Sequence, residues 1–228
     1  ILAEGRVRFV GEPVAFIVAD TLAEAKDAAE MILLDIDDRP AKLDIAPGGE
    51  AIHDEVPDNV AYDFAMGDEA AIEAAMAGAA HVVTHTSYDN RIIVNSMEPR
   101  ACFAEVDGDR IHVAVNGQGV WGTKGELAKW LGLPEDRVRV TNPDVGGGFG
   151  MKSMNYPEYL LSAHAARVLD RPVRWIGERT ESMLSDNGGR DLSVTVTLGF
   201  DADLKLVAFR TDSLSNMGAY PSNFGMNI

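Results

Sequence analysis

Residues 141–153 read Thr-Asn-Pro-Asp-Val-Gly-Gly-Gly-Phe-Gly-Met-Lys-Ser, and the rest of the chain is predicted to be arranged around this stretch. Four of its residues are glycines, which adopt backbone conformations closed to other residues and let another group approach the main chain. The preceding segment, Arg137 to Thr141, predicts a short strand, and Tyr156 to Leu169 predicts a helix. Exposed amides and a helix start favour negative charge. The stretch therefore predicts either a cradle for an anionic or oxo-bearing group or a tight turn without a ligand.

Two common phosphate-binding motifs do not fit this stretch. A dinucleotide fingerprint needs Gly-x-Gly-x-x-Gly, and counting from Gly146 the last glycine comes one residue early. A P-loop needs glycine directly before Lys-Ser, where this chain has Met151. The glycines are therefore not interpreted as a nucleotide-binding loop of either kind.

Composition narrows the class of protein. The chain has 228 residues, of which 46% are hydrophobic, so it can bury a core. Its 20 basic and 36 acidic residues give a net charge of -16, which argues against a broad nucleic-acid surface. The single cysteine, Cys102, cannot form an internal disulfide or hold an iron–sulfur cluster. No apolar run is long enough to span a membrane, so we expect a cytoplasmic protein. The ends, Ile1 and Ile228, look like cuts through a longer polypeptide.

The first third of the chain predicts a small α/β unit followed by a linker. Alternation predicts strands at 6–10, 14–19 and 33–36. Thr21 and Glu24 predict a capping box that opens a helix between these strands. Residues 37–63 are punctuated by proline and glycine, and they predict a linker and a domain boundary.

The remaining chain predicts alternating strands and helices. Asp68 is predicted to cap a helix. His81 and His85 are four apart, as in a zinc site on a helix, but Val-Val-Thr between them favours a strand. The other predicted strands are 101–106, 110–115, 173–176, 192–200 and 204–214, and the other predicted helices are 120–131 and 178–184. In the helix at 156–169, the predicted buried residues are Leu161, Ala165, Val168 and Leu169.

Four polar residues allow two interpretations each. Glu98 and Arg100 either form a satisfied ion pair or line a site. Gln118 lies where a strand ends and a helix starts, and its amide can both donate and accept a hydrogen bond, so it is either a turn residue or a functional one. Arg190 either meets an anion or pairs with a nearby acid.

Several segments together carry a family resemblance. The chain resembles the molybdenum-binding large subunit of the xanthine oxidase family, nearest to aerobic carbon monoxide dehydrogenase large chains. The matching segments, in the family's order, are 7–15, Met-Glu-Pro-Arg at 97–100, Gln118, 131–138, 143–152, 156–158, 171–175, 189–191 and 218–220. The resemblance implies an α/β (α+β) fold, in which residues 1–45 end an α/β hammerhead domain, 46–60 form a linker and 61–228 begin the molybdopterin-binding domain.

The resemblance also implies a chemistry. Such enzymes carry molybdenum on molybdopterin cytosine dinucleotide and hydroxylate a small-molecule substrate with oxygen derived from water. Electrons leave through an iron–sulfur small subunit and an FAD medium subunit, which agrees with the single cysteine of this chain. The remainder of the large subunit would be a further partner, and we expect the 228-residue chain alone to be inactive.

By the same resemblance, Gln118 would be the catalytic residue that hydrogen-bonds an oxo ligand of molybdenum. Gly147, Gly148, Phe149 and Gly150 would bind the cofactor together with Gln118, and no side chain would ligate the metal directly. Gln118 is therefore expected to point toward the glycine turn.

One departure bears on the substrate. Ser153 follows Lys152 where the xanthine and aldehyde branch has a glutamate, and this resembles the carbon monoxide branch. Two alternatives stay open, namely the same scaffold acting on an aldehyde or N-heterocycle, and a non-catalytic binding or assembly module.

Overall fold

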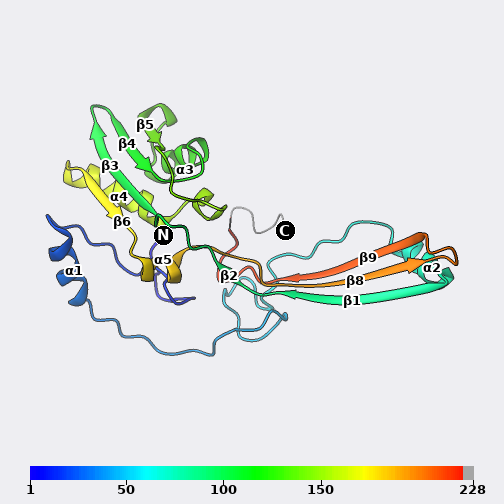
Figure 1. Cartoon of the computed structure of the whole chain (residues 1–228). Helices are drawn as coiled ribbons and strands as arrows, with labels where there is room; N and C mark the ends of the chain where they lie inside the picture. The colour runs from blue at the N-terminus through cyan, green and yellow to red at the C-terminus, as the bar shows by residue number, and fades with distance from the viewer. Residues whose placement is uncertain (223–228) are drawn as a thin grey trace. The chain divides into compact units, whose positions relative to one another are not determined.

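A computed structural model describes residues 1–222 of the chain (Figure 1). The chain divides into two compact units, each built from two separate stretches. Unit 1 comprises Ile1–Asp37 and Ile93–Gly188, and unit 2 comprises Asp38–Ile92 and the residues from Gly189 onward. The predicted class, mixed α/β, is confirmed.

Unit 1 contains a four-stranded sheet in the order β5-β4-β3-β6. The hairpin of β3 (Ala101–Asp107) and β4 (Arg110–Val115) forms its centre, as the Asp-Gly turn signal predicted. β6 (Val173–Ile176) pairs antiparallel with β3, and β5 (Val138–Thr141) pairs parallel with β4. Because β4 and β5 run parallel, their carboxyl ends lie at the same edge of the sheet.

Helices α3 (Trp121–Leu131) and α4 (Pro157–Leu169) cover one face of this sheet, and α4 packs on β3, β4 and β6. The buried side chains of the strands alternate toward that face, as a half-covered sheet requires. The core combines strand residues Cys102, Ala104, Ile111, Val113, Val115, Val138 and Val173 with helix residues Leu127, Ala128, Tyr159, Leu160, Ala163 and Ala166.

The predicted buried face of α4 is wrong at the end of the helix, whereas Leu161 and Ala165 are half-buried and Ala165 packs against the core. Val168 and Leu169 are exposed, whereas Tyr159, Ser162 and Ala166 are buried. The buried stripe includes the polar residues Glu158 and Ser162, because they are the hydrogen-bond partners of the buried Arg100 and Cys102. The spacing of apolar residues in the sequence could not predict this face, because part of it is polar.

The amino-terminal stretch has one regular element, α1 (Leu22–Glu30), and the predicted capping box of Thr21 and Glu24 is confirmed. The predicted strands at 6–10, 14–19 and 33–36 are wrong, because no strand forms in these segments. A strand needs a partner for its backbone groups, and the hydrogen bond from the Ala3 amide to the Pro13 carbonyl, at 2.8 Å, does not extend into a strand pair. Phe16 nevertheless packs against the core of unit 1.

Unit 2 contains a three-stranded antiparallel sheet in the order β1-β8-β9. Its strands are β1 (His81–Asp89), β8 (Leu192–Phe200) and β9 (Leu206–Ser215), close to the predicted ranges. α2 (Glu69–Gly78) packs on β8 and β9, and the Asp68 side chain caps it as predicted.

The remaining elements are short. They are β2 (Ile92–Ile93), which pairs with β7 (Gly188–Gly189), α5 (Arg179–Ser185), and two 3-10 turns, η1 (Glu135–Arg137) and η2 (Met151–Ser153). Residues 38–68 contain no helix or strand. The division at 1–45, 46–60 and 61–228 stays a prediction, and residues 223–228 lie outside the described part of the chain.

Among residues 1–222, no helix is both long enough and apolar enough to cross a membrane.

Candidate functional site

The glycine turn, residues 146–150, meets Gln118 at one edge of the unit 1 sheet. Gln118 lies just beyond the end of β4, and the turn lies beyond the end of the parallel neighbour β5. The Gln118 side-chain oxygen Oε1 accepts a hydrogen bond from the Gly150 amide at 2.8 Å. The Gln118 backbone amide donates to the carbonyl of Lys152 at 3.0 Å. The expected approach of Gln118 to the turn is therefore confirmed.

Three of the four glycines in the turn lie close to other side chains, and the fourth lies beside open space. A Cβ built on Gly146 would lie 2.6 Å from Glu98 Cβ, and one on Gly148 would lie 2.6 Å from Gln118 Oε1. Gly147 has a φ of +99°, in the left-handed region that favours glycine, and its Cβ would lie 3.2 Å from Ser96 Cβ. Gly150 has a φ of +87° and no atom within 4 Å of an added Cβ, so open space lies beside it. A side chain at 146 would meet the Cβ of Glu98, which cannot move aside, whereas a side chain at 148 would meet the end of the exposed Gln118 side chain, which can rotate away.

The turn presents unused hydrogen-bond donors. Among the described residues, the backbone amides of Gly147, Gly148 and Phe149 and the Nε2 group of Gln118 have no hydrogen-bond partner. Phe149 itself has a φ of +53°, an outlier for a bulky residue, and its side chain is 76% exposed. Such strain persists where the surrounding structure imposes it, and it is frequent at functional sites.

An ion pair lies behind the turn, and the sequence did not reveal it. Glu98 Oε2 accepts hydrogen bonds from the Gly146 amide at 2.8 Å and from Lys152 Nζ at 2.9 Å. The Lys152 side chain is fully buried. Burial acts to raise the pKa of Glu98, but the bonds from Lys152 and Gly146 outweigh it and hold this pKa below its usual value. The predicted pairing of Glu98 with Arg100 is wrong, because each residue has a different partner.

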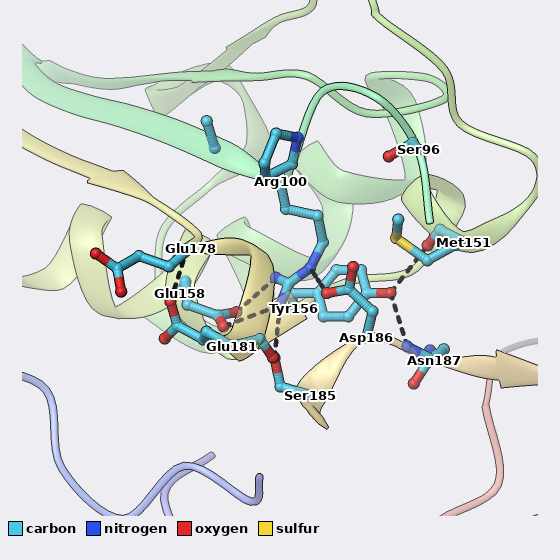
Figure 2. Close-up of polar contacts among 12 residues, drawn as sticks. Ser96, Arg100, Met151, Tyr156, Glu158, Glu178, Glu181, Ser185, Asp186 and Asn187 are labelled. Atoms are coloured by element: carbon cyan, nitrogen blue, oxygen red, sulfur yellow. Dashed lines mark hydrogen bonds and ion pairs between the residues drawn. The ribbon is translucent and has the colours of Figure 1, made fainter. Parts of the chain in front are cut away.

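Arg100 instead forms the centre of a buried cluster (Figure 2). Its guanidinium is completely buried and binds Glu158 through two nitrogens, at 2.9 and 3.2 Å, and Asp186 at 2.5 Å. Burial alone would lower the pKa of Arg100, but the two carboxylates outweigh it and raise that pKa. A buried charge needs partners of this kind. No local pattern could indicate these partners, since they lie 58 and 86 residues away.

Tyr156 connects this cluster to Met151, the residue that follows the glycine turn. Its ring lies 3.6 Å from the Arg100 guanidinium carbon, and its hydroxyl donates to the carbonyl of Met151 at 3.1 Å (Figure 2). Burial raises the pKa of Tyr156 to about 12, so the hydroxyl keeps its proton at neutral pH. The cluster therefore fixes the residue that follows Gly150.

Comparison with known proteins identifies the family. The family described as "Molybdopterin cofactor-binding domain" matches residues 52–228. The chain belongs to this family. Its relatives include the nicotine 6-hydroxylase large subunit of Paenarthrobacter nicotinovorans, 34% identical over 96% of this chain and 28% of the relative. They also include the carbon monoxide dehydrogenase large chain of Hydrogenophaga pseudoflava, 28% identical over 96% of this chain and 30% of the relative.

Solved structures agree with this family. A Cu,Mo-CO dehydrogenase aligns with a TM-score of 0.87 and 27% identity, over 94% of this chain and 29% of that one. Quinoline 2-oxidoreductase from Pseudomonas putida 86 aligns with a TM-score of 0.83 and 32% identity, over 97% of this chain and 29% of that one. The predicted resemblance to the xanthine oxidase family is confirmed, and the chain spans less than a third of the length of these relatives.

The turn of this molybdopterin cofactor-binding domain suits an anionic or oxo-bearing group. Its unused donors are backbone amides and one neutral side-chain amide, and oxygen atoms are the acceptors that such donors need. Gly150 leaves the adjoining space open. The residues present therefore fit the cofactor of the family, although their individual roles stay predictions.

The other candidate residues do not join this site. His81 and His85 lie on β1 of unit 2, on a strand as predicted, and Arg190 pairs with Asp89 at 3.3 Å. Cys102 is buried in the core beside Ser162, and burial raises the pKa of its thiol to about 12. Residues 1–222 contain no group of three or more histidine, cysteine or acidic side chains placed to hold a metal ion.

Proposed function

We propose that this chain is the part of a molybdenum-binding large subunit that presents Gln118 and the glycine turn to the molybdenum–pterin cofactor. The enzyme would be an oxidoreductase that hydroxylates the carbon of a small-molecule substrate with oxygen from water. The observation that supports it most is the 2.8 Å hydrogen bond between Gln118 Oε1 and the Gly150 amide, in a chain that belongs to the cofactor-binding family. This bond joins two sites that the sequence separates by 32 residues.

The bound cofactor would supply the two-electron redox centre and the site of oxygen transfer. The chain's own residues would orient it. Because Gly150 occupies Oε1 of Gln118, the amide plane is fixed and Nε2 is left to donate to an acceptor on the cofactor. An amide donor orients an oxygen without adding a charge near the redox centre. The unused amides of Gly147, Gly148 and Phe149 would bind the same oxygen-rich face, and the exposed Phe149 ring would exclude water.

The cofactor form and the partners belong to the same proposal. We expect molybdopterin cytosine dinucleotide, the remainder of the large subunit, an iron–sulfur small subunit and an FAD medium subunit, in the cytoplasm. The single cysteine supports separate electron-transfer chains, because an iron–sulfur cluster needs several thiolates.

Two substrate classes are supported by different observations. Carbon monoxide is supported by Ser153 after Lys152 and by the TM-score of 0.87 to a CO dehydrogenase. An N-heterocycle is supported by higher identity, 34% to a nicotine 6-hydroxylase subunit and 32% to a quinoline 2-oxidoreductase. We propose a carbon monoxide dehydrogenase-type enzyme, with N-heterocycle hydroxylation as the second candidate.

One experiment tests both levels of the proposal. The full-length subunit is purified with its co-purifying chains, its molybdenum and pterin nucleotide are measured, and reduction of an artificial acceptor is followed with carbon monoxide, quinoline, nicotine and an aldehyde. Bound molybdenum with turnover of carbon monoxide supports the proposal. Turnover of a heterocycle alone replaces the substrate class, and a protein without molybdenum or pterin supports a non-catalytic module.

A further inference from the structure

A charged residue, Glu98, contacts both the start of the glycine turn and the lysine that follows the turn. We propose that Glu98 is a positioning residue, which fixes both ends of the glycine turn through Gly146 and Lys152 and thereby orients Gln118. The identity of the group that the oriented Gln118 amide contacts rests on the function proposed above. The fixing of the turn by Glu98 does not depend on that function.

Glu98 makes three contacts that span the turn. Its Oε2 accepts from the Gly146 amide at 2.8 Å, where the turn begins, and from Lys152 Nζ at 2.9 Å, just after it ends. Its own backbone amide donates to the Gly146 carbonyl at 3.1 Å. One carboxylate therefore sets the separation between residues 146 and 152.

The burial of Lys152 makes its ion pair with Glu98 necessary. Its side chain has no exposed surface, and Glu98 is its one hydrogen-bond acceptor among the described residues. A buried ammonium without an acceptor is strongly unfavourable, so Lys152 stays where Glu98 holds it. The carbonyl of the same Lys152 accepts the backbone amide of Gln118 at 3.0 Å. Glu98 thus holds the backbone of Gln118 in place through Lys152, and it holds the side chain of Gln118 in place through the glycine turn.

Glu98 is itself held on a rigid support. Two residues further along, Arg100 is locked in the core by Glu158 and Asp186. On the other side, Arg179 donates to the carbonyls of Ser96 and Met97, at 2.8 and 2.9 Å. A shift of the segment between these anchors would break the buried ion pairs of Arg100 or the hydrogen bonds of Arg179, so Glu98 is suited to position the turn rather than to follow it.

The experiment compares four variants of the full-length subunit. Glu98→Ala removes the acceptor, Glu98→Gln keeps an acceptor oxygen without the charge, and Lys152→Met removes the buried ammonium. The control is Glu105→Ala. Glu105 also accepts from a cation-forming partner, His112 at 3.0 Å, and its side chain is 38% exposed against 41% for Glu98. Two readouts are taken: hydrogen exchange of the peptide covering 143–153 in cofactor-free protein, and molybdenum content with kcat and KM in the loaded enzyme.

We expect Glu98→Ala to speed exchange in 143–153 by about tenfold or more, because the variant loses the two hydrogen bonds that the carboxylate accepts from the Gly146 amide and Lys152 Nζ. Peptides from β3 and α4 should exchange as in the wild type, Glu98→Gln should give a smaller increase, and Glu105→Ala should give none. In the loaded enzyme, kcat should fall while KM and molybdenum content stay nearly constant.

Two results would overturn the proposal. One is unchanged exchange of 143–153 in Glu98→Ala, and the other is a uniform increase in all core peptides, which would show a general structural role. If the wild type binds no molybdenum, the proposed function fails, yet the exchange arm still decides whether Glu98 fixes the turn.

Discussion

Gly148→Ala, alone and combined with Gln118→Ala, gives the sharpest test of how the turn and Gln118 fit together. A Cβ on Gly148 would lie 2.6 Å from both Cδ and Oε1 of Gln118. Comfortable contact begins near 3.5 Å, so the two groups overlap by about 1 Å. The backbone at Gly148 lies outside the left-handed region, so alanine itself fits the local conformation.

The structure sets the size of the effect. Gln118 is exposed and can rotate away, and this relief breaks its hydrogen bond to the Gly150 amide, worth about 0.5–1.5 kcal/mol. The added methyl group also restricts the unfolded chain, which stabilises the fold by about 0.4–1 kcal/mol. Gly148→Ala alone should therefore change the free energy of unfolding by less than about 1 kcal/mol. Gln118→Ala loses the same hydrogen bond, so the double variant loses it only once, and the two changes should be non-additive by about 1 kcal/mol.

The assay is urea unfolding of the 228-residue chain followed by tryptophan fluorescence, with protection of the Gly150 amide as a local readout. That protection should fall in both single variants and no further in the double variant. Gly122→Ala is the control, because Gly122 lies in α3 with no atom within 4 Å of an added Cβ. The change in unfolding free energy caused by Gly122→Ala should add to the change caused by Gln118→Ala. If Gly148→Ala and Gln118→Ala are also additive, Gln118 does not occupy the space beside Gly148 and the description of the site is wrong.

Three further predictions concern the core, the thiol and the reaction. Arg100→Met leaves two buried carboxylates unpaired and should destabilise the chain by about 3–5 kcal/mol, with a smaller deficit at low pH as they protonate; urea unfolding at several pH values measures it. The folded-state pKa of the Cys102 thiol is raised from 9.0 to about 12. The stability that this thiol contributes is therefore present below pH 9 and is lost as the pH rises toward 12. In urea unfolding, Cys102→Ala should lose less stability than the wild type between pH 9 and pH 12. In the full-length enzyme, Gln118→Ala should lower kcat by about 100-fold with molybdenum content unchanged, as for loss of one transition-state hydrogen-bond donor, and the 228-residue chain alone should show no turnover with any acceptor.

Local patterns predicted most helices and strands of the two units, because each has its own periodicity, cap or turn signal. The Asp107-Gly108 hairpin and the capping box of Thr21 are examples. The failures occur where a segment depends on a partner elsewhere. The segments at 6–10 and 14–19 have the composition of strands, yet β-propensity mainly reports packing against neighbouring strands, and no sheet forms there. In α4, Glu158 and Ser162 face inward because Arg100 and Cys102 need them.

The glycine turn illustrates why its chemistry could be predicted and its support could not. The pattern of glycines indicated exposed amides, and those of Gly147 and Gly148 are indeed without partners among the described residues. The pattern did not indicate which side chains lie against the glycines at 146 and 148. Gly146 accommodates Glu98, which lies 48 residues away, and Gly148 accommodates Gln118. Two separate contacts, one with Glu98 and one with Gln118, therefore appear in the sequence as a single run of glycines, and only substitutions at separate positions can distinguish them.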